Sequence, residues 1–133
     1  MRIDQAALLG LASAAAVAAM ACTEVRGPSF SNLSNEAVRV SATFDVPPEQ
    51  TVRDLQIDPG TTFRDPFDQQ LVSLTVQAHG RKFELDADAV LKARGSLDKR
   101  DQFWVFDGSA ICVTTVKGID AIKREGCGTA NGR

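Results

Sequence analysis

The stretch LVSLTVQAHGRKFELDA, residues 71–87, decides the fold, because two alternating apolar runs flank the dipeptide His79-Gly80. Glycine reaches positive φ angles without steric cost, so a two-residue hairpin loop fits at this dipeptide. Such a loop predicts three apolar pairs on one face: Val76 with Phe83, Leu74 with Leu85, and Val72 with Ala87. The opposite face then carries the polar residues Ser73, Thr75 and Gln77.

The segment AVRVSATFD, residues 37–45, alternates in the same way and predicts a second strand with one wet face. Pro47 and Pro48 end this strand, since proline cannot donate to a strand ladder. Residues 48–58 are ambiguous. One reading is a short helix that begins at Pro48 and places Val52 and Leu55 on one face.

The remaining segments predict a loop, a helix and a second hairpin. Residues 61–70 fit a loop whose Phe63 and Phe67 lie against the sheet. Residues 86–95 fit a short helix that Asp86 or Asp88 caps and Gly95 ends. Residues 103–116 read as two strands about Asp107-Gly108.

Two cysteines near the C-terminus are candidates for a disulfide. A tight hairpin at Lys117-Gly118 would place Cys112 opposite Lys123, away from Cys127. A short helix over 119–125 that turns back at Gly126 would instead bring Cys127 to Cys112 and close a loop of about 15 residues. The alternative is two unrelated thiols.

These segments together predict a mainly β, α+β fold: a small antiparallel sheet or sandwich with one or two short helices. The chain has 133 residues, enough for one domain, which we assign to residues 36–133.

The N-terminal part has the features of an export signal. Arg2 precedes the apolar run AALLGLASAAAVAAMA, residues 6–21, which is shorter than the roughly 20 residues of a spanning helix. The run ends in Ala19-Met20-Ala21, the small-x-small pattern of a cleavage site. We therefore expect residues 1–21 to be a signal peptide that is cut before Cys22.

Ala21 and Cys22 resemble the end of a bacterial lipoprotein signal, in which the cysteine after the cut is acylated. Ala19 departs from that pattern, because leucine is usual three places before the cysteine. The resemblance implies a lipidated Cys22 with up to three acyl chains, and so membrane lipid as a partner. Thr23 stands where an aspartate often signals inner-membrane retention, which favours the outer membrane, facing the periplasm. Residues 22–35 would then be the lipidated N-terminus and a flexible tether.

Two other fates of this segment remain open. An ordinary signal peptidase would leave Cys22 as a free thiol on a soluble periplasmic or secreted protein. An uncleaved membrane anchor is the third reading. Lipidation accounts for the odd cysteine, because it leaves Cys112 and Cys127 as a pair in an oxidising compartment.

The export signal and the lipoprotein resemblance imply a function in the cell envelope without fixing an activity. A net charge of −2 argues against a nucleic-acid partner. We expect a non-enzymatic binding or structural protein of the envelope, with an envelope protein as a possible partner. The alternatives are a periplasmic inhibitor of an envelope hydrolase and an enzyme that uses carboxylates. The aromatic cluster of Trp104, Phe103 and Phe106 is the candidate binding surface, with core packing as its alternative.

The reactive side chains give no sign of catalysis, so we expect no catalytic residue, no metal and no cofactor. His79 is the only histidine and lies in the predicted turn. Asp86 and Asp88 resemble the first ligands of a calcium loop, but Val90 and Leu91 interrupt the pattern. Asp65 and Asp68 fit a solvated loop.

Overall fold

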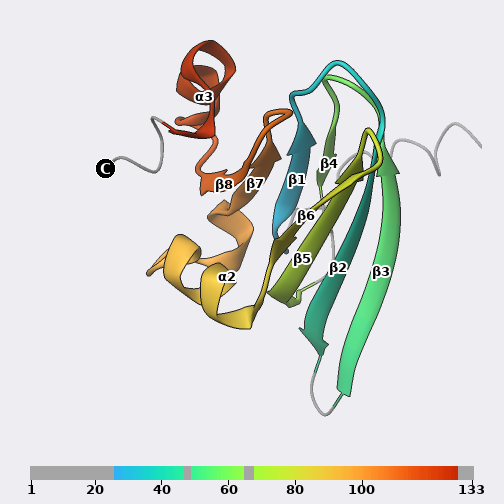
Figure 1. Ribbon diagram of the computed structural model, residues 1–133. Helices are drawn as coiled ribbons and strands as arrows, with labels where there is room; N and C mark the ends of the chain where they lie inside the picture. Colours follow the sequence, from blue (N-terminus) through green and yellow to red (C-terminus); the bar gives the residue numbers. More distant parts are fainter. Residues whose placement is uncertain (1–25, 47–48, 65–67, 129–133) are drawn as a thin grey trace, which may run out of the picture.

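Two four-stranded sheets carry the fold in the computed structural model, which describes residues 26–46, 49–64 and 68–128. The first, here called the long-strand sheet, has the order β3-β2-β5-β6, formed by Glu49–Ile57, Val38–Val46, Gln70–Ala78 and Arg81–Leu85. The second, the short-strand sheet, has the order β4-β1-β7-β8, formed by Thr62–Arg64, Ser29–Asn32, Phe103–Phe106 and Ile111–Thr114. The predicted mainly β, α+β fold with short helices is confirmed (Figure 1).

The hairpin predicted from residues 71–87 is present as β5 and β6. Its register pairs Val76 with Phe83 and Leu74 with Leu85, as the apolar pattern requires. His79 and Gly80 form the connecting turn with φ angles of 56° and 73°, which is the backbone of a primed two-residue turn.

The third predicted pair of this hairpin, Val72 with Ala87, is wrong. Ala87 begins helix α2, and a β-bulge shifts the register of β2 against β5 between Thr43 and Phe44. The extra residue is Val72 of β5, which has no partner between Ser73 and Leu71. It changes the side-chain alternation, so Leu71, before the bulge, faces the core like Leu74 after it. Leu71 is therefore buried in the core, and Val72 is only half-buried.

Residues 49–57 form strand β3, so the reading of 48–58 as a helix is wrong. Val46 pairs with Glu49 and Val38 with Ile57, which makes β2 and β3 one long hairpin. In a strand, Val52 and Leu55 point to opposite faces, and Val52 is 61% exposed. The hydrogen bonds to β2 outweigh the local signal for a helix start.

Two further strands lie where the sequence predicts a tether and a loop. Residues 29–32 of the predicted tether 22–35 form β1, which is buried along its whole length and pairs with β7 in parallel and with β4 antiparallel. β4 and the start of β5 lie within the predicted loop 61–70. β1 has too few apolar residues for a periodic signal, and its partners supply the burial.

Asn32, at the end of β1, joins the two sheets. Its fully buried amide donates from Nδ2 to the carbonyl of Ile57 in β3 at 2.9 Å and to the carbonyl of Glu36. Its Oδ1 accepts the N–H of Ser34 at 3.0 Å.

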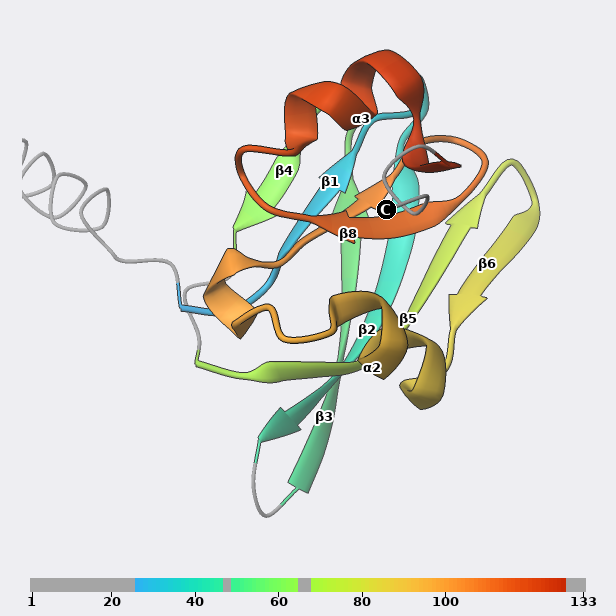
Figure 2. The same cartoon turned by 90° about the vertical axis from the view of Figure 1, so that its left-hand side faces the viewer.

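Both predicted helices are present. Asp86 caps α2 (Ala87–Arg94) by accepting the N–H of Ala89 at 2.8 Å, and Gly95 ends it. α3 (Ile119–Glu125) ends at Gly126. A short 3₁₀ turn, η1 (Lys99–Asp101), precedes β7. Figures 1 and 2 show α2 and α3 on the side of the molecule away from β2 and β3.

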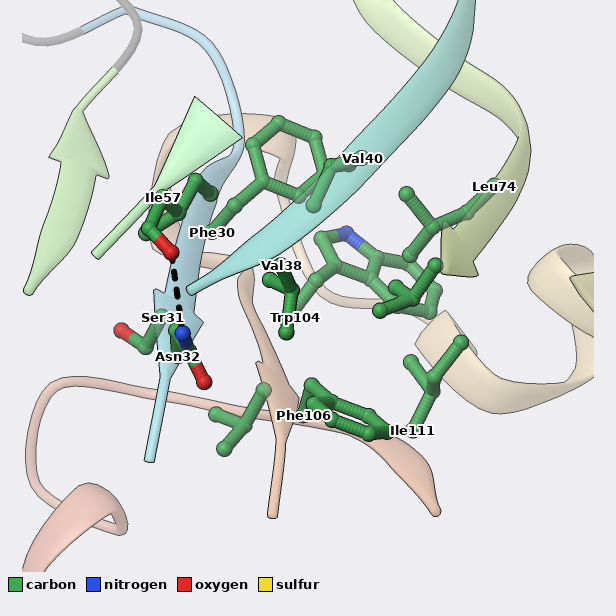
Figure 3. Close-up of a pocket in the computed structure, with 12 residues that line it drawn as sticks. Phe30, Ser31, Asn32, Val38, Val40, Ile57, Leu74, Trp104, Phe106 and Ile111 are labelled. Atoms are coloured by element: carbon green, nitrogen blue, oxygen red, sulfur yellow. Dashed lines mark hydrogen bonds between the residues drawn. The ribbon is translucent and has the colours of Figure 1, made fainter. Parts of the chain in front are cut away.

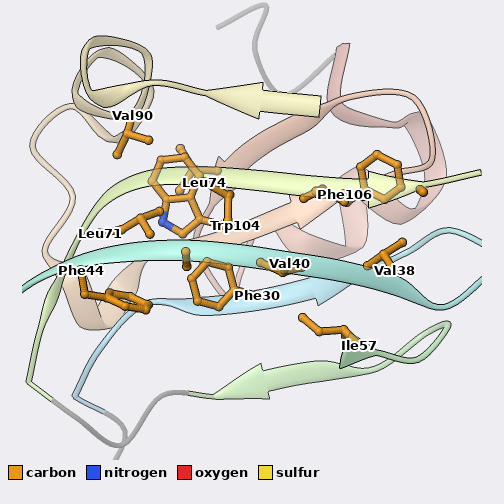
Figure 4. Packing of buried hydrophobic residues seen from close by; sticks show 14 residues of the cluster. Phe30, Val38, Val40, Phe44, Ile57, Leu71, Leu74, Val90, Trp104 and Phe106 are labelled. Carbon is orange, nitrogen blue, oxygen red and sulfur yellow. The ribbon is translucent and has the colours of Figure 1, made fainter. Parts of the chain in front are cut away.

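The core fills the space between the sheets (Figure 4). Trp104 and Phe106 of β7 pack against side chains from β1, β2, β5 and α2, with Phe30 edge-on to Phe44 at 6.1 Å. A second, smaller cluster covers the other face of the short-strand sheet: Phe103, Val105, Cys112, Ile122 and Cys127. Both faces of β7 are therefore buried.

The predicted signal peptide, residues 1–21, and Cys22 lie outside the described residues. Across the part of the chain that the structure describes, no helix has the length and apolar character needed to cross a bilayer.

Candidate functional site

The aromatic cluster predicted as a binding surface is part of the core. Trp104 is 1% exposed, Phe106 3% and Phe103 5%. The Trp104 indole also satisfies its N–H inside the protein, by donating to Oε1 of the buried Gln102 at 3.0 Å. The prediction of an exposed aromatic surface is wrong, because β7 lies in the interior of its sheet and is covered on both sides.

A small gap remains beside this cluster (Figure 3). It measures about 10 Å³, and its lining is mainly apolar, with Phe30, Val40, Trp104 and Phe106 among its walls. A cavity of this size holds at most one water molecule. It is a packing gap and cannot admit a ligand.

The two C-terminal cysteines come together as predicted. Cys112 on β8 and Cys127 after α3 lie at disulfide-bonding distance, with Cα atoms 5.5 Å apart. Cys127 is fully buried, and its N–H donates to Oδ2 of Asp107 at 2.8 Å. The pair fixes α3 against the short-strand sheet.

The other reactive side chains of the sequence analysis are solvated. His79 is exposed in its turn, with Nδ1 2.9 Å from a carboxylate oxygen of Glu36. Asp86 serves as a helix cap, and Asp65 lies outside the described residues. Within residues 26–46, 49–64 and 68–128, no group of three or more His, Cys, Asp or Glu side chains is placed to hold a metal.

A hollow that the sequence analysis missed lies at the outer face of the short-strand sheet, and we call it the basic cleft. Its volume is about 370 Å³, within the range of small-ligand sites. Four separate segments contribute to it: β4, the region around η1, the start of β7 and the loop from β8 to α3. The lining residues are Arg64, Leu97, Arg100, Asp101, Phe103, Thr115, Val116 and Lys117.

Strand pairing builds the floor of the cleft. Ser29 of β1 pairs with Arg64 on one side and with Phe103 on the other, so the three side chains share one row and one face. The small Ser29 side chain lets the guanidinium of Arg64 reach across and lie over the Phe103 ring, 5.3 Å from its centroid. Ser29 is fully buried, and its Oγ has no hydrogen-bond partner among the described residues.

Positive charge dominates the lining, with Arg64, Arg100 and Lys117 against the single carboxylate of Asp101. Arg100 donates from Nε to Asp98 at 3.1 Å on the surface beside the cleft. The neighbouring Lys99 pairs with Asp68, and its hydrogen bond and charge hold the pKa of the Asp68 carboxyl below the ordinary value.

The cleft also exposes apolar surface. Val116 stands next to Lys117 in the loop from β8 to α3 and is 62% exposed. Leu97 is half-buried at the wall of the cleft, whereas Phe103 is 5% exposed and lies beneath the guanidinium of Arg64. The combination of cations and a protruding aliphatic side chain suits an amphipathic, anionic ligand.

A second groove bears on the enzymatic alternative. Asp45 and Asp88 line the same hollow of about 240 Å³ beside α2, together with Arg94. Both aspartates are exposed to water. They therefore lack the desolvated setting in which carboxylates are tuned for general acid–base catalysis.

The chain matches no family model, no curated protein and no solved structure.

Proposed function

We propose that the chain is a lipid-anchored protein of the bacterial cell envelope that acts by binding and not by catalysis. The support comes from the three cysteines. Cys112 and Cys127 lie at disulfide-bonding distance, which leaves Cys22 as the third, directly after the apolar run 6–21 and Ala21. Acylation of Cys22 accounts for this cysteine and for its position.

Only a short stretch of chain lies between Cys22 and the first strand of the domain. β1 begins at Ser29, only seven residues after Cys22, so the domain would be held close to the bilayer. Two or more acyl chains give firm attachment, since each buried methylene contributes about 0.8 kcal/mol and one chain alone binds reversibly. We place the anchor in the outer membrane, facing the periplasm, because Thr23 follows the cysteine.

The binding role rests on the basic cleft. It is an open hollow lined by three cations and by apolar side chains, an arrangement that holds an anionic partner through charge and contact. The two carboxylates of the groove beside α2 are solvated, which favours the non-enzymatic reading over the carboxylate enzyme.

Intact-mass analysis of membrane and soluble fractions tests the anchor. We expect the wild-type protein in the detergent-extracted membrane fraction, cut before Cys22 and heavier by the acylglyceryl group. Cys22→Ala should lose both the added mass and the membrane association. Thr23→Ala, the adjacent substitution, serves as the matched control and should keep the lipid. A wild-type protein that is soluble, cut after Ala21 and unmodified would refute the proposal.

A further inference from the structure

The basic cleft lies on the side of the domain where the described chain begins. The N–H of Ser29, the first residue of β1, donates to the carbonyl of Gln102 at 2.9 Å, and Ser29 pairs with Arg64 and Phe103 of the cleft. In Figure 2, the beginning of β1, the turn before β7 and the loop from β8 to α3 lie on the left side of the molecule.

The length of chain before β1 limits which surface can meet a membrane. Six residues, 23–28, separate Cys22 from Ser29, so the Cα atoms of Cys22 and Ser29 can lie at most about 25 Å apart. A domain of about 100 residues has a radius of gyration of roughly 13 Å, so its far side lies beyond the reach of such a tether. An anchor at Cys22 therefore keeps the side with the basic cleft nearest the bilayer.

The chemistry of the cleft matches an anionic lipid surface. Arg64, Arg100 and Lys117 present positive charge, and Arg26, three residues before β1, adds a cation near the same end. Anionic phospholipid attracts lysine and arginine that lie within a Debye length of the surface. Val116, 62% exposed beside Lys117, supplies the apolar contact that such cations alone lack.

From this juxtaposition we infer that the basic cleft is a second membrane contact, which seats the domain on anionic phospholipid headgroups with Val116 at the interface. The inference rests on the proposed anchor at Cys22. It assigns an orientation: the short-strand sheet faces the lipid, and the wet face of the long-strand sheet is directed away from it.

Two cysteine variants of the lipidated full chain test this orientation. Val116→Cys and Val52→Cys replace valines of matched exposure, 62% and 61%; Val116 lies in the loop from β8 to α3 beside the basic cleft, and Val52 on the outer face of β3 in the long-strand sheet. Each is labelled without reductant with an environment-sensitive dye and reconstituted into vesicles of phosphatidylcholine, or of phosphatidylcholine with about a third phosphatidylglycerol. We expect dye at position 116 to brighten about twofold or more with phosphatidylglycerol and to be quenched by spin-labelled lipid. Dye at position 52 should not respond.

Charge reversal supplies the second arm. Arg100→Glu with Lys117→Glu in the cleft should abolish the response of the dye at position 116. Arg39→Glu with Lys82→Glu, the same change of charge on the outer face of the long-strand sheet, should leave it intact. Raising the salt concentration should also weaken the response, because it screens exposed charges. Circular dichroism and thermal unfolding check that each pair still folds.

Three results would overturn the inference. One is equal responses at positions 116 and 52. Another is a response at position 116 that is independent of phosphatidylglycerol. The third is a response that requires added envelope protein in place of anionic lipid, which would assign the cleft to a protein partner. Flotation of the vesicles is measured first and keeps the two proposals apart. A protein that fails to float with vesicles refutes the anchor, whereas one that floats without a dye response refutes only the seating of the cleft.

Discussion

The two sheets bury their residues in different ways. β2, β3 and β5 of the long-strand sheet have nine residues each, and this sheet turns one face to the core and the other to water. The strands of the short-strand sheet have three or four residues, and β1 and β7 are buried on both faces. The length of its strands stabilises the long-strand sheet, whereas the packing of α3 and the cysteine pair stabilise the short-strand sheet.

Because of this difference, the outer faces of the two sheets offer different surfaces for binding. The outer face of the long-strand sheet carries polar residues such as Arg39, Asp54 and Gln77, together with the exposed Val52 on its edge strand β3. On the short-strand sheet, α3 packs through Ile119 and Ile122 against the outer face, and the basic cleft lies beside it, lined by cations and the exposed Val116.

Removal of the cysteine pair, which supports the short-strand sheet, should change the free energy of unfolding more than any other substitution below. We expect Cys112→Ser with Cys127→Ser to lower the free energy of unfolding by about 3 kcal/mol, because the pair closes a loop across a sequence separation of 15. Urea unfolding followed by Trp104 fluorescence measures the change. Reduction of the wild type should reproduce it, and Cys22→Ser should not. Equal stability of the oxidised and reduced wild type would show that α3 needs no such link.

A matched pair of valine truncations tests the two outer faces directly. Val105 on the outer face of β7 is fully buried beneath α3, whereas Val52 on the outer face of β3 is 61% exposed. We expect Val105→Ala to cost about 2 kcal/mol, from lost burial and an unfilled gap. Val52→Ala should change the free energy of unfolding by less than about 0.5 kcal/mol. Similar values for the two variants would contradict the assignment of a covered and an open face.

The same contrast explains what could be predicted from the sequence. Alternation with period two identified β2, β5 and β6, because each of these strands has one wet face, and the turn dipeptide Asp107-Gly108 identified the pair β7 and β8. Alternation did not identify β3, which is exposed along most of its length. The helix over 119–125 could be predicted together with the cysteine pair, because Cys127 reaches Cys112 only if the chain turns back at Gly126. Alternation is a signal between neighbouring residues, and the disulfide prediction depends on a single pair, Cys112 and Cys127.

The elements that could not be predicted depend on partners distant in the chain. β1, with the sequence SFSN, is buried only because β4 and β7 flank it. The bulge between β2 and β5 turns Leu71 of β5 toward the core. No glycine at this point of the sequence indicates a bulge. The basic cleft needs Arg64 beside Phe103, and the parallel pairing of β1 with β7 that brings them together leaves no periodic pattern.

The smallest expected change in stability concerns the loop between β7 and β8, where Asp107 accepts hydrogen bonds at the end of the short-strand sheet. Burial acts to raise the pKa of the Asp107 carboxyl. The N–H groups of Cys127, Ser109 and Ala110 and the Ser109 hydroxyl donate to it, and together they lower the pKa below its ordinary 3.8. Asp107 therefore stabilises the fold above pH 3.8, and this contribution is lost as the pH falls through the lowered value.

We expect Asp107→Asn to lower the free energy of unfolding by about 1 kcal/mol at neutral pH, because a neutral amide offers one acceptor oxygen where the carboxylate offers two. The difference from wild type should shrink below pH 3.8, where the wild-type carboxylate also becomes protonated. Urea unfolding across this pH range measures it. Asp45→Asn, the same change of charge at the exposed end of β2, controls for net charge. A constant difference between Asp107→Asn and wild type would mean that the loop is held by packing, as in the core, and not by the charge of Asp107.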